Sequence, residues 1–120
     1  MAKLLVVDDE IDITEFAKSF FTKRKVNVFT AGGGAEALTI IEKEKPDLVL
    51  LDIQMKEMSG IETLRALRQN NNNVKVIMVT GAEESSIVAE ANSLGIQKYI
   101  HKPLILEELE KIVMKELNAA

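Results

Sequence analysis

The sequence contains no cysteine, which excludes disulfides, thiolate zinc sites and cysteine nucleophiles. Long apolar runs are missing too, so we expect neither a signal peptide nor a membrane-spanning helix. An excess of positive charge is also absent, because 15 basic and 19 acidic residues give a net charge of −4, which argues against a protein that binds nucleic-acid phosphates. We therefore expect a cytoplasmic protein that contacts neither nucleic acid nor a membrane directly.

Short apolar runs recur along the chain and lack the polar alternation of a half-exposed strand. Such runs are typical of strands that are buried on both faces of a parallel sheet. The predicted strands span residues 3–8, 26–30, 47–52, 74–80 and 96–100. A chain of 120 residues that forms one domain buries roughly two-thirds of the surface exposed when it is unfolded. We expect a single domain over residues 1–120.

Each predicted strand is followed by apolar residues at helical spacing. In the first of these segments, Ile13, Phe16, Ala17 and Phe20 stand at i, i+3, i+4 and i+7. The later stripes are Gly34, Ala37, Leu38 and Ile41; Ile61, Leu64 and Leu67; Ile87, Ala91 and Leu94; and Leu106, Leu109 and Val113. Strict alternation with right-handed crossovers predicts an α/β fold. We expect the doubly wound, flavodoxin-like architecture, a five-stranded parallel sheet with helices on both faces, and if its strand order is 2-1-3-4-5 the first and third strands are neighbours.

Polar residues follow most of the predicted strands. The first strand ends in Asp8 and Asp9, the third in Asp52 and the fourth in Thr80, while Lys102 follows the fifth. Taken singly, each could be a helix cap or ordinary loop sequence. Together they lie at the sheet edge where α/β proteins bind ligands. Because clustered carboxylates repel one another, they favour a hard divalent cation, and an all-oxygen set is typical of Mg²⁺.

Four motifs occur in order: VVDDE, LVLLDIQMKEMSGIE, VIMVTG and YIHKP. Over essentially its whole length the chain resembles the CheY-like receiver domain of two-component response regulators. The resemblance implies that Asp52 accepts a phosphoryl group from a histidine kinase or a histidine phosphotransfer protein. It also implies that Asp8, Asp9, Asp52 and the main-chain carbonyl of Gln54 hold Mg²⁺. The domain would phosphorylate and dephosphorylate itself, and would not turn over a separate substrate.

The same resemblance implies roles for residues near the later strands. Thr80, the Gly81 N–H and the Lys102 ammonium would bind the phosphoryl oxygens. Thr80 and Tyr99 would move together as a switch, although packing alone could also explain Tyr99. The switch would act on the surface formed by the fourth helix, fifth strand and fifth helix, about residues 84–117. We expect that surface to contact a downstream partner or an output domain.

The chain departs from the family pattern at several positions. Lys56 and Glu57 occupy a loop that usually contains proline, although Gly60 is retained where the next helix begins. Gln97 and Lys98 replace an acidic pair that one class of regulators uses to dimerise. We therefore expect a monomer or a weak, phosphorylation-dependent dimer.

Gln54 and Ala82 stand at two positions that tune phosphate lifetime in the family, but they do not predict that lifetime here. His101 is interpreted as a bystander, because no second histidine or cysteine accompanies it to bind zinc.

Two other functions fit the same fold class. A flavodoxin-like flavin carrier needs a phosphate cradle after the first strand, where Asp8, Asp9 and Glu10 would repel a phosphate. A Mg²⁺-dependent aspartyl phosphohydrolase generally needs a cap or long loops around its substrate, for which 120 residues leave little room.

Two local features are also predicted. The Lys102–Pro103 bond should be cis, as it is in receivers. Ile11 lies about 200° around its helix from the Ile13 stripe and should face solvent. With Pro103 and Leu104 it could form an apolar rim that docks the phosphodonor protein, although isolated surface isoleucines are also common.

Overall fold

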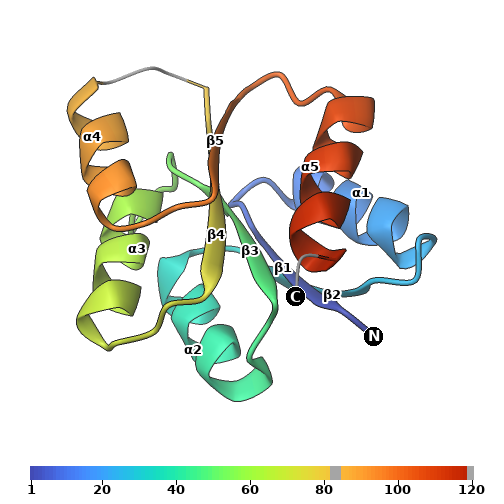
Figure 1. Cartoon of the computed structure of the whole chain (residues 1–120), viewed down its shortest axis with the longest axis horizontal. Coiled ribbons are helices and arrows are strands. Elements are labelled where there is room, and N and C mark those ends of the chain that lie inside the picture. The colour runs from blue at the N-terminus through green and yellow to red at the C-terminus, as the bar shows by residue number, and fades with distance from the viewer. Residues whose placement is uncertain (82–84, 119–120) are drawn as a thin grey trace.

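The computed structural model describes residues 1–81 and 85–118, and these form a parallel sheet between two layers of helices (Figure 1). The elements are β1 (Lys3–Val7), α1 (Ile11–Thr22), β2 (Asn27–Ala31), α2 (Gly34–Glu44), β3 (Leu48–Asp52), α3 (Gly60–Gln69), β4 (Lys75–Thr80), α4 (Ser85–Ser93), β5 (Lys98–His101) and α5 (Leu106–Asn118). The five strands are ordered β2-β1-β3-β4-β5 and every neighbouring pair is parallel. This confirms the predicted fold class.

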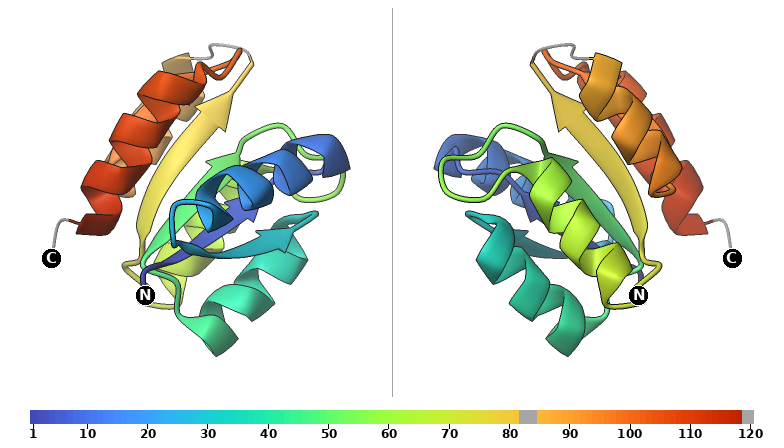
Figure 2. Two further views of the ribbon diagram at one scale, coloured as in Figure 1. Left: turned by 90° about the vertical axis from the view of Figure 1, so that its right-hand side faces the viewer. Right: turned by 90° about the vertical axis from the view of Figure 1, so that its left-hand side faces the viewer.

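Alternate residues of the central strands enter two separate cores. Leu5 and Val7 pack with residues of α2, α3 and α4, whereas Leu4 and Val6 pack with residues of α1 and α5. Figure 2 shows the corresponding helix layers from the two sides of the sheet. Because both faces of these strands are covered, both positions of the alternation must be apolar, which explains the uninterrupted apolar runs.

Helix α1 packs most of the expected stripe toward the core, because Ile13, Ala17 and Phe20 are partly buried and the last two contact the core cluster. Its buried positions are Thr14 and Phe21, whereas Phe16, which was expected within the apolar stripe, is 53% exposed. Phe16 lines an apolar groove of about 500 Å³ between α1 and the start of α5, and this groove is incompletely filled. Ile11 is 74% exposed, as predicted.

Backbone turns at the carboxyl ends of α3 and α4 follow the predicted signals. Gly95, two residues after the end of α4, has φ +80°, and Asn71, in the polar tract after α3, has φ 59°. Both conformations lie in the left-handed region that Gly and Asn tolerate best. Within residues 1–81 and 85–118, no helix is both long and apolar enough to cross a membrane.

Arg68 on α3 joins these two turns. Its guanidinium donates to the carbonyls of Leu94 and Gly95 at 2.7 Å each, and to those of Asn72 and Val74 at 2.9 and 3.1 Å. Burial lowers the pKa of Arg68. One side chain thus ties the end of α4 to α3 and to the residues before β4.

Candidate functional site

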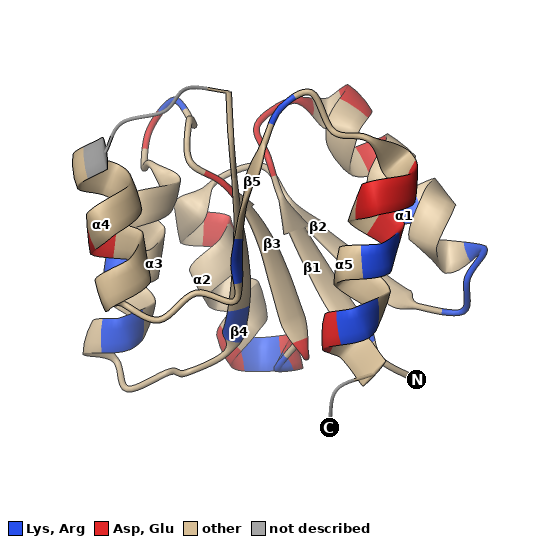
Figure 3. Ribbon diagram, turned by 45° about the horizontal axis from the view of Figure 1, so that its top comes forward, with Lys and Arg blue, Asp and Glu red and all other residues tan. Residues whose placement is uncertain are grey.

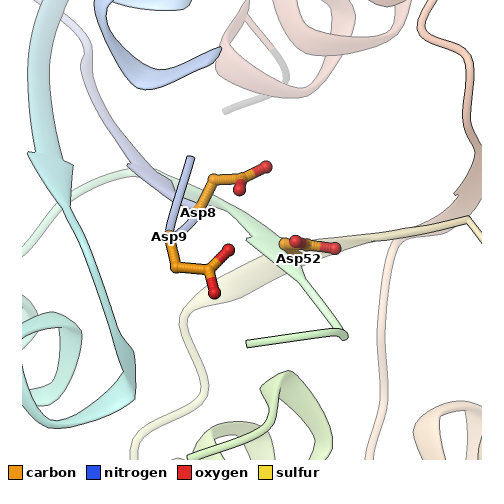
Figure 4. A group of neighbouring side chains, drawn as sticks. All are labelled: Asp8, Asp9 and Asp52. Carbon is orange, nitrogen blue, oxygen red and sulfur yellow. The ribbon is translucent and has the colours of Figure 1, made fainter. Parts of the chain in front are cut away.

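Three carboxylates meet where β1 and β3 end. Parallel pairing places Val7 beside Leu51, so the residues that follow them, Asp8 and Asp52, are neighbours at the carboxyl edge of the sheet. Asp9 is the next residue of the same turn. Figure 4 shows the three side chains clustered at this edge, from the end of β1 and the end of β3. The predicted convergence is therefore present in the structure.

The cluster has the composition and the spacing of a cation site. One carboxylate oxygen from each of Asp8, Asp9 and Asp52 lies within 4.8 Å of the others. Asp8 and Asp52 are only 4% and 3% exposed, whereas Asp9 is partly exposed. Oxygen ligands that are close together and partly open to solvent suit Mg²⁺, which retains several waters. The residues present thus fit the ion that the sequence predicts.

Lys102 approaches the cluster from the β5–α5 loop. Its backbone N–H donates to the Thr80 carbonyl at 2.7 Å, and its side-chain Nζ lies 3.5 Å from Asp8 Oδ2 and 3.5 Å from Asp52 Oδ2. Nζ also lies 3.8 Å from Glu10 Oε1, a contact that sequence reasoning missed. The Lys102–Pro103 peptide bond is cis, as predicted.

The electrostatic environment shifts two pKa values. Burial raises the pKa of Asp52 and the Asp8 carboxylate raises it further, while the Lys102 charge acts in the opposite direction. For Lys102, burial alone would lower the pKa, but the Asp52 and Asp8 carboxylates more than offset this and the pKa is raised. At neutral pH the ammonium is therefore protonated and partly neutralises the cluster.

The expected phosphoryl ligands lie on one side of this cluster. Thr80 is the last residue of β4 and is buried, and the exposed Gly81 follows it. Gln54 lies close to Gly81, because a Cβ atom added at Gly81 would be 3.8 Å from the Gln54 Oε1. Asp9, Gln54 and Thr80 line one open cavity of about 530 Å³. These residues therefore surround a single space beside Asp52.

Tyr99 reaches the same cavity from β5. Its ring packs against the core, and its hydroxyl is buried without a hydrogen-bond partner among the described residues. The cavity wall also includes Thr80 from β4 and Ile87 from α4. His101 is exposed, and its ring lies 5.5 Å from the Tyr99 ring, between centroids. Ala82 and Glu84, which were singled out from the sequence, lie outside the described residues.

Gly60 packs against the backbone at the end of β3. Its N–H donates to the Ile53 carbonyl at 2.9 Å, which closes the β3–α3 loop. A Cβ at Gly60 would overlap the main-chain oxygen of Asp52 and lie 2.8 Å from the Ile53 Cα. Ser59 and Glu62 then form a capping box that starts α3. The glycine was noted in the sequence, but its contact with Asp52 required the structure.

Comparisons with known proteins agree with this geometry. Residues 4–114 match the family model described as the response regulator receiver domain. Over 115 residues the chain is 36% identical to the sporulation initiation phosphotransferase F of Bacillus subtilis, covering 96% of this chain and 93% of that protein. It is 34% identical to the regulatory protein AtoC of Escherichia coli, covering 97% of this chain but only 25% of that protein. The relatives thus include both short and much longer proteins.

Solved structures resemble the fold of this chain closely. A CheY-like response regulator receiver domain protein from Methanospirillum hungatei superimposes with a TM-score of 0.92 at 29% identity, covering 98% of this chain and 94% of that chain. The response regulator protein TrrA from Thermotoga maritima, crystallised in complex with Mg²⁺ and BeF, gives a TM-score of 0.83 at 33% identity, covering 98% of this chain and 100% of that chain.

Proposed function

The chain belongs to the family of response regulator receiver domains, and on this premise we propose that Asp52 is the residue that accepts the phosphoryl group. The observation that carries this assignment is the position of Asp52. It is a buried carboxylate at the end of a central strand, within 4.8 Å of two other carboxylates and 3.5 Å from a lysine ammonium. The donor is the phosphohistidine of a histidine kinase or a histidine phosphotransfer protein.

The transfer uses the residues around Asp52 in distinct ways. An Asp52 carboxylate oxygen attacks phosphorus, a P–O bond forms, and the P–N bond to the donor histidine breaks. The electron pair of that bond stays on the imidazole, which takes a proton from solvent. Lys102 stabilises negative charge on the phosphoryl oxygens, while the Thr80 hydroxyl and the Gly81 N–H donate to them. Later hydrolysis of the acyl phosphate would restore Asp52.

The divalent ion of this site is proposed to be Mg²⁺, held by Asp8, Asp9, Asp52 and the main-chain carbonyl of Gln54. When bound, Mg²⁺ neutralises carboxylate charge and draws phosphoryl oxygens toward the nucleophile. Asp9→Ala should remove most Mg²⁺ affinity, measured by calorimetric titration. Asp12→Ala, an exposed change of the same charge on α1, should leave it intact. Undiminished affinity in Asp9→Ala would contradict this ligand set.

Phosphorylation is proposed to be read out through Thr80 and Tyr99. The two side chains line one cavity with Ile87 of α4, so a shift of Thr80 toward a phosphoryl group can be transmitted to α4 and β5. This is a population shift between two packings of the α4–β5–α5 surface. Thr80→Ala should still accept a phosphoryl group but should no longer couple it to binding of the downstream partner or output domain. Unchanged coupling would contradict the switch.

The donor protein is proposed to dock near the apolar groove between α1 and α5. Pro103, Leu104 and Phe16 line this groove, and Ile11 stands exposed at the start of α1. The groove lies beside the site because Lys102 contributes to its wall. Apolar side chains exposed together are typical of a surface that another protein covers.

The central experiment is intact-mass measurement after incubation with acetyl phosphate and Mg²⁺. The wild type should gain the mass of one phosphoryl group, and Asp52→Ala should gain none. Asp47→Ala serves as the matched control, because Asp47 is an exposed carboxylate at the amino-terminal edge of the sheet and should leave labelling unchanged. Labelling that persists in Asp52→Ala would overturn the assignment of the nucleophile.

A further inference from the structure

The loop between β3 and α3 carries a lysine where receivers usually carry proline. Both ends of this loop are fixed to the sheet edge, because Ile53 donates to the Val79 carbonyl and Gly60 donates to the Ile53 carbonyl, each at 2.9 Å. Lys56 stands between these two anchors. The loop that carries Lys56 therefore begins and ends at the carboxyl edge of the sheet.

Lys56 shares its surroundings with the proposed site. It lines the 530 Å³ cavity together with Asp9 and Thr80, and a neighbouring cavity of about 520 Å³ again together with Asp9. In Figure 3 the β3–α3 loop carries a basic segment beside an acidic one, and the acidic segments at the ends of β1 and β3 lie between this loop and a basic segment on the β5–α5 loop. Lys56 and Asp9 therefore border the same two spaces at the carboxyl edge of the sheet.

The two lysines differ in how much of their charge is already paired. Lys102 Nζ lies within 3.8 Å of three carboxylates. Lys56 is exposed and takes part in none of the ion pairs found in the described part of the chain. Its ammonium therefore remains available to an anion that enters the cavity.

The charge of the site makes such a cation useful. Asp8, Asp9 and Asp52 bring three negative charges, which Lys102 offsets only in part. A phosphoryl donor is itself an anion, and the excess carboxylate charge repels it until Mg²⁺ binds and offsets that charge. A cation at the mouth of a cleft raises the local concentration of an anionic reactant and its rate of association.

We propose that Lys56 is a second cationic group of the phosphoryl-accepting site, which attracts the anionic donor to the mouth of the cavity. The proposal rests on the proposed function of Asp52. Lys56 acts on encounter and takes no part in bond formation or proton transfer. The same charge repels a divalent cation, so Lys56 has opposite effects on the two ligands of the site.

The test compares Lys56→Met with Lys56→Arg. At low ionic strength Lys56→Met should be labelled by acetyl phosphate about three- to tenfold more slowly than the wild type, while Lys56→Arg should stay near the wild-type rate. The difference should shrink at high salt, where the Debye length falls from about 10 Å at 0.1 M to about 3 Å at 1 M. Phosphoramidate, which is less negatively charged than acetyl phosphate, should show a smaller loss.

Mg²⁺ affinity gives an independent readout that does not require phosphorylation. Removing a nearby positive charge should tighten Mg²⁺ binding by about two- to threefold in Lys56→Met at low salt. A merely distorted loop would weaken Mg²⁺ binding and slow labelling together. Lys43→Met, an exposed change of the same charge on α2, should alter neither quantity.

The outcomes separate this proposal from the proposed function. If the wild type is labelled on Asp52 but Lys56→Met is labelled equally fast at low salt, or is slowed equally at low and high salt, the role of Lys56 is wrong. Weaker Mg²⁺ binding in Lys56→Met would overturn it as well. If the wild type takes no phosphoryl group at all, the proposed function fails, and the donor role of Lys56 fails with it.

Discussion

Replacing Asp52 by Asn removes one negative charge from the acidic end of the sheet and leaves the side-chain size almost unchanged. Asp52 is 3% exposed and lies within 4.8 Å of carboxylate oxygens of Asp8 and Asp9. We expect the variant to be more stable than the wild type in Mg²⁺-free buffer at neutral pH, because the native structure holds this charge in an unfavourable position.

The magnitude follows from the distances. With an effective dielectric constant of about 20, two carboxylates at the 4.8 Å limit repel by about 3 kcal/mol, and closer ones repel more strongly. The attraction between Asp52 and Lys102 at 3.5 Å is about 5 kcal/mol on the same scale. Burial and the Asp8 carboxylate thus outweigh the Lys102 ammonium, in agreement with the raised pKa of Asp52. We expect a net gain of about 2 kcal/mol in the free energy of unfolding, or about 8 °C in Tm.

The sign of the pH dependence is fixed by the raised pKa. Below the ordinary carboxyl value of 3.8, Asp52 is protonated in both the folded and the unfolded chain, so the advantage of Asp52→Asn vanishes. As the pH rises from 3.8 through the raised pKa of the folded state, the wild type loses stability relative to the variant. Above that pKa the full difference is present.

Thermal and urea unfolding in EDTA at neutral and acidic pH provide the assay. Asp47→Asn is the control, since Asp47 is exposed and accepts the Lys3 N–H at 2.8 Å, and its stability should change by less than about 0.5 kcal/mol. Saturating Mg²⁺ should narrow the gap, because it stabilises the wild type by mass action. An Asp52→Asn variant no more stable than the wild type at neutral pH in EDTA would refute the reasoning.

Three further predictions concern other parts of the molecule. Gly60→Ala should lower the free energy of unfolding by about 1–3 kcal/mol and slow acetyl phosphate labelling, because the added Cβ would displace the Asp52 backbone. In the control Gly33→Ala, no atom lies within 4 Å of the added Cβ, so both the stability and the labelling rate should stay unchanged. Arg68→Met should cost about 2 kcal/mol in urea unfolding, because four carbonyls lose their donor, and a cost below about 0.5 kcal/mol would contradict the role assigned to Arg68. Ile11→Asp should slow transfer from the cognate kinase but not from acetyl phosphate, and equal slowing with both donors would mean that Ile11 supports the site instead of the docking surface.

The family match decides among the functions that the sequence left open. A receiver, a flavin carrier and an aspartyl phosphohydrolase all fit a doubly wound sheet. The match over residues 4–114 and the receiver structures of high TM-score support the first. The roles of individual residues remain proposals for the experiments described above.

The sequence by itself determined the parallel strands and the edge at which to look for the site, whereas the strand order came from the structure. Strands such as DLVLLD are apolar at every inner position, and only a sheet covered on both faces buries all of them. Once alternation with helices makes the strands parallel, their carboxyl ends must share one edge. Asp8, Asp52 and Thr80 were therefore predictable at one edge from local patterns, and as neighbours only on the condition that the strand order is 2-1-3-4-5.

Other features depended on how separate elements pack. The exposure of Phe16 follows from the incompletely filled groove between α1 and α5, and helical periodicity around one helix does not contain that information. The contact of Glu10 with Lys102 and the fit of Gly60 against Asp52 join segments that meet only after folding. Periodicity records which residues of one element share a face. Distances between atoms of different elements are set by the packing of the whole chain, and only the tertiary structure supplies them.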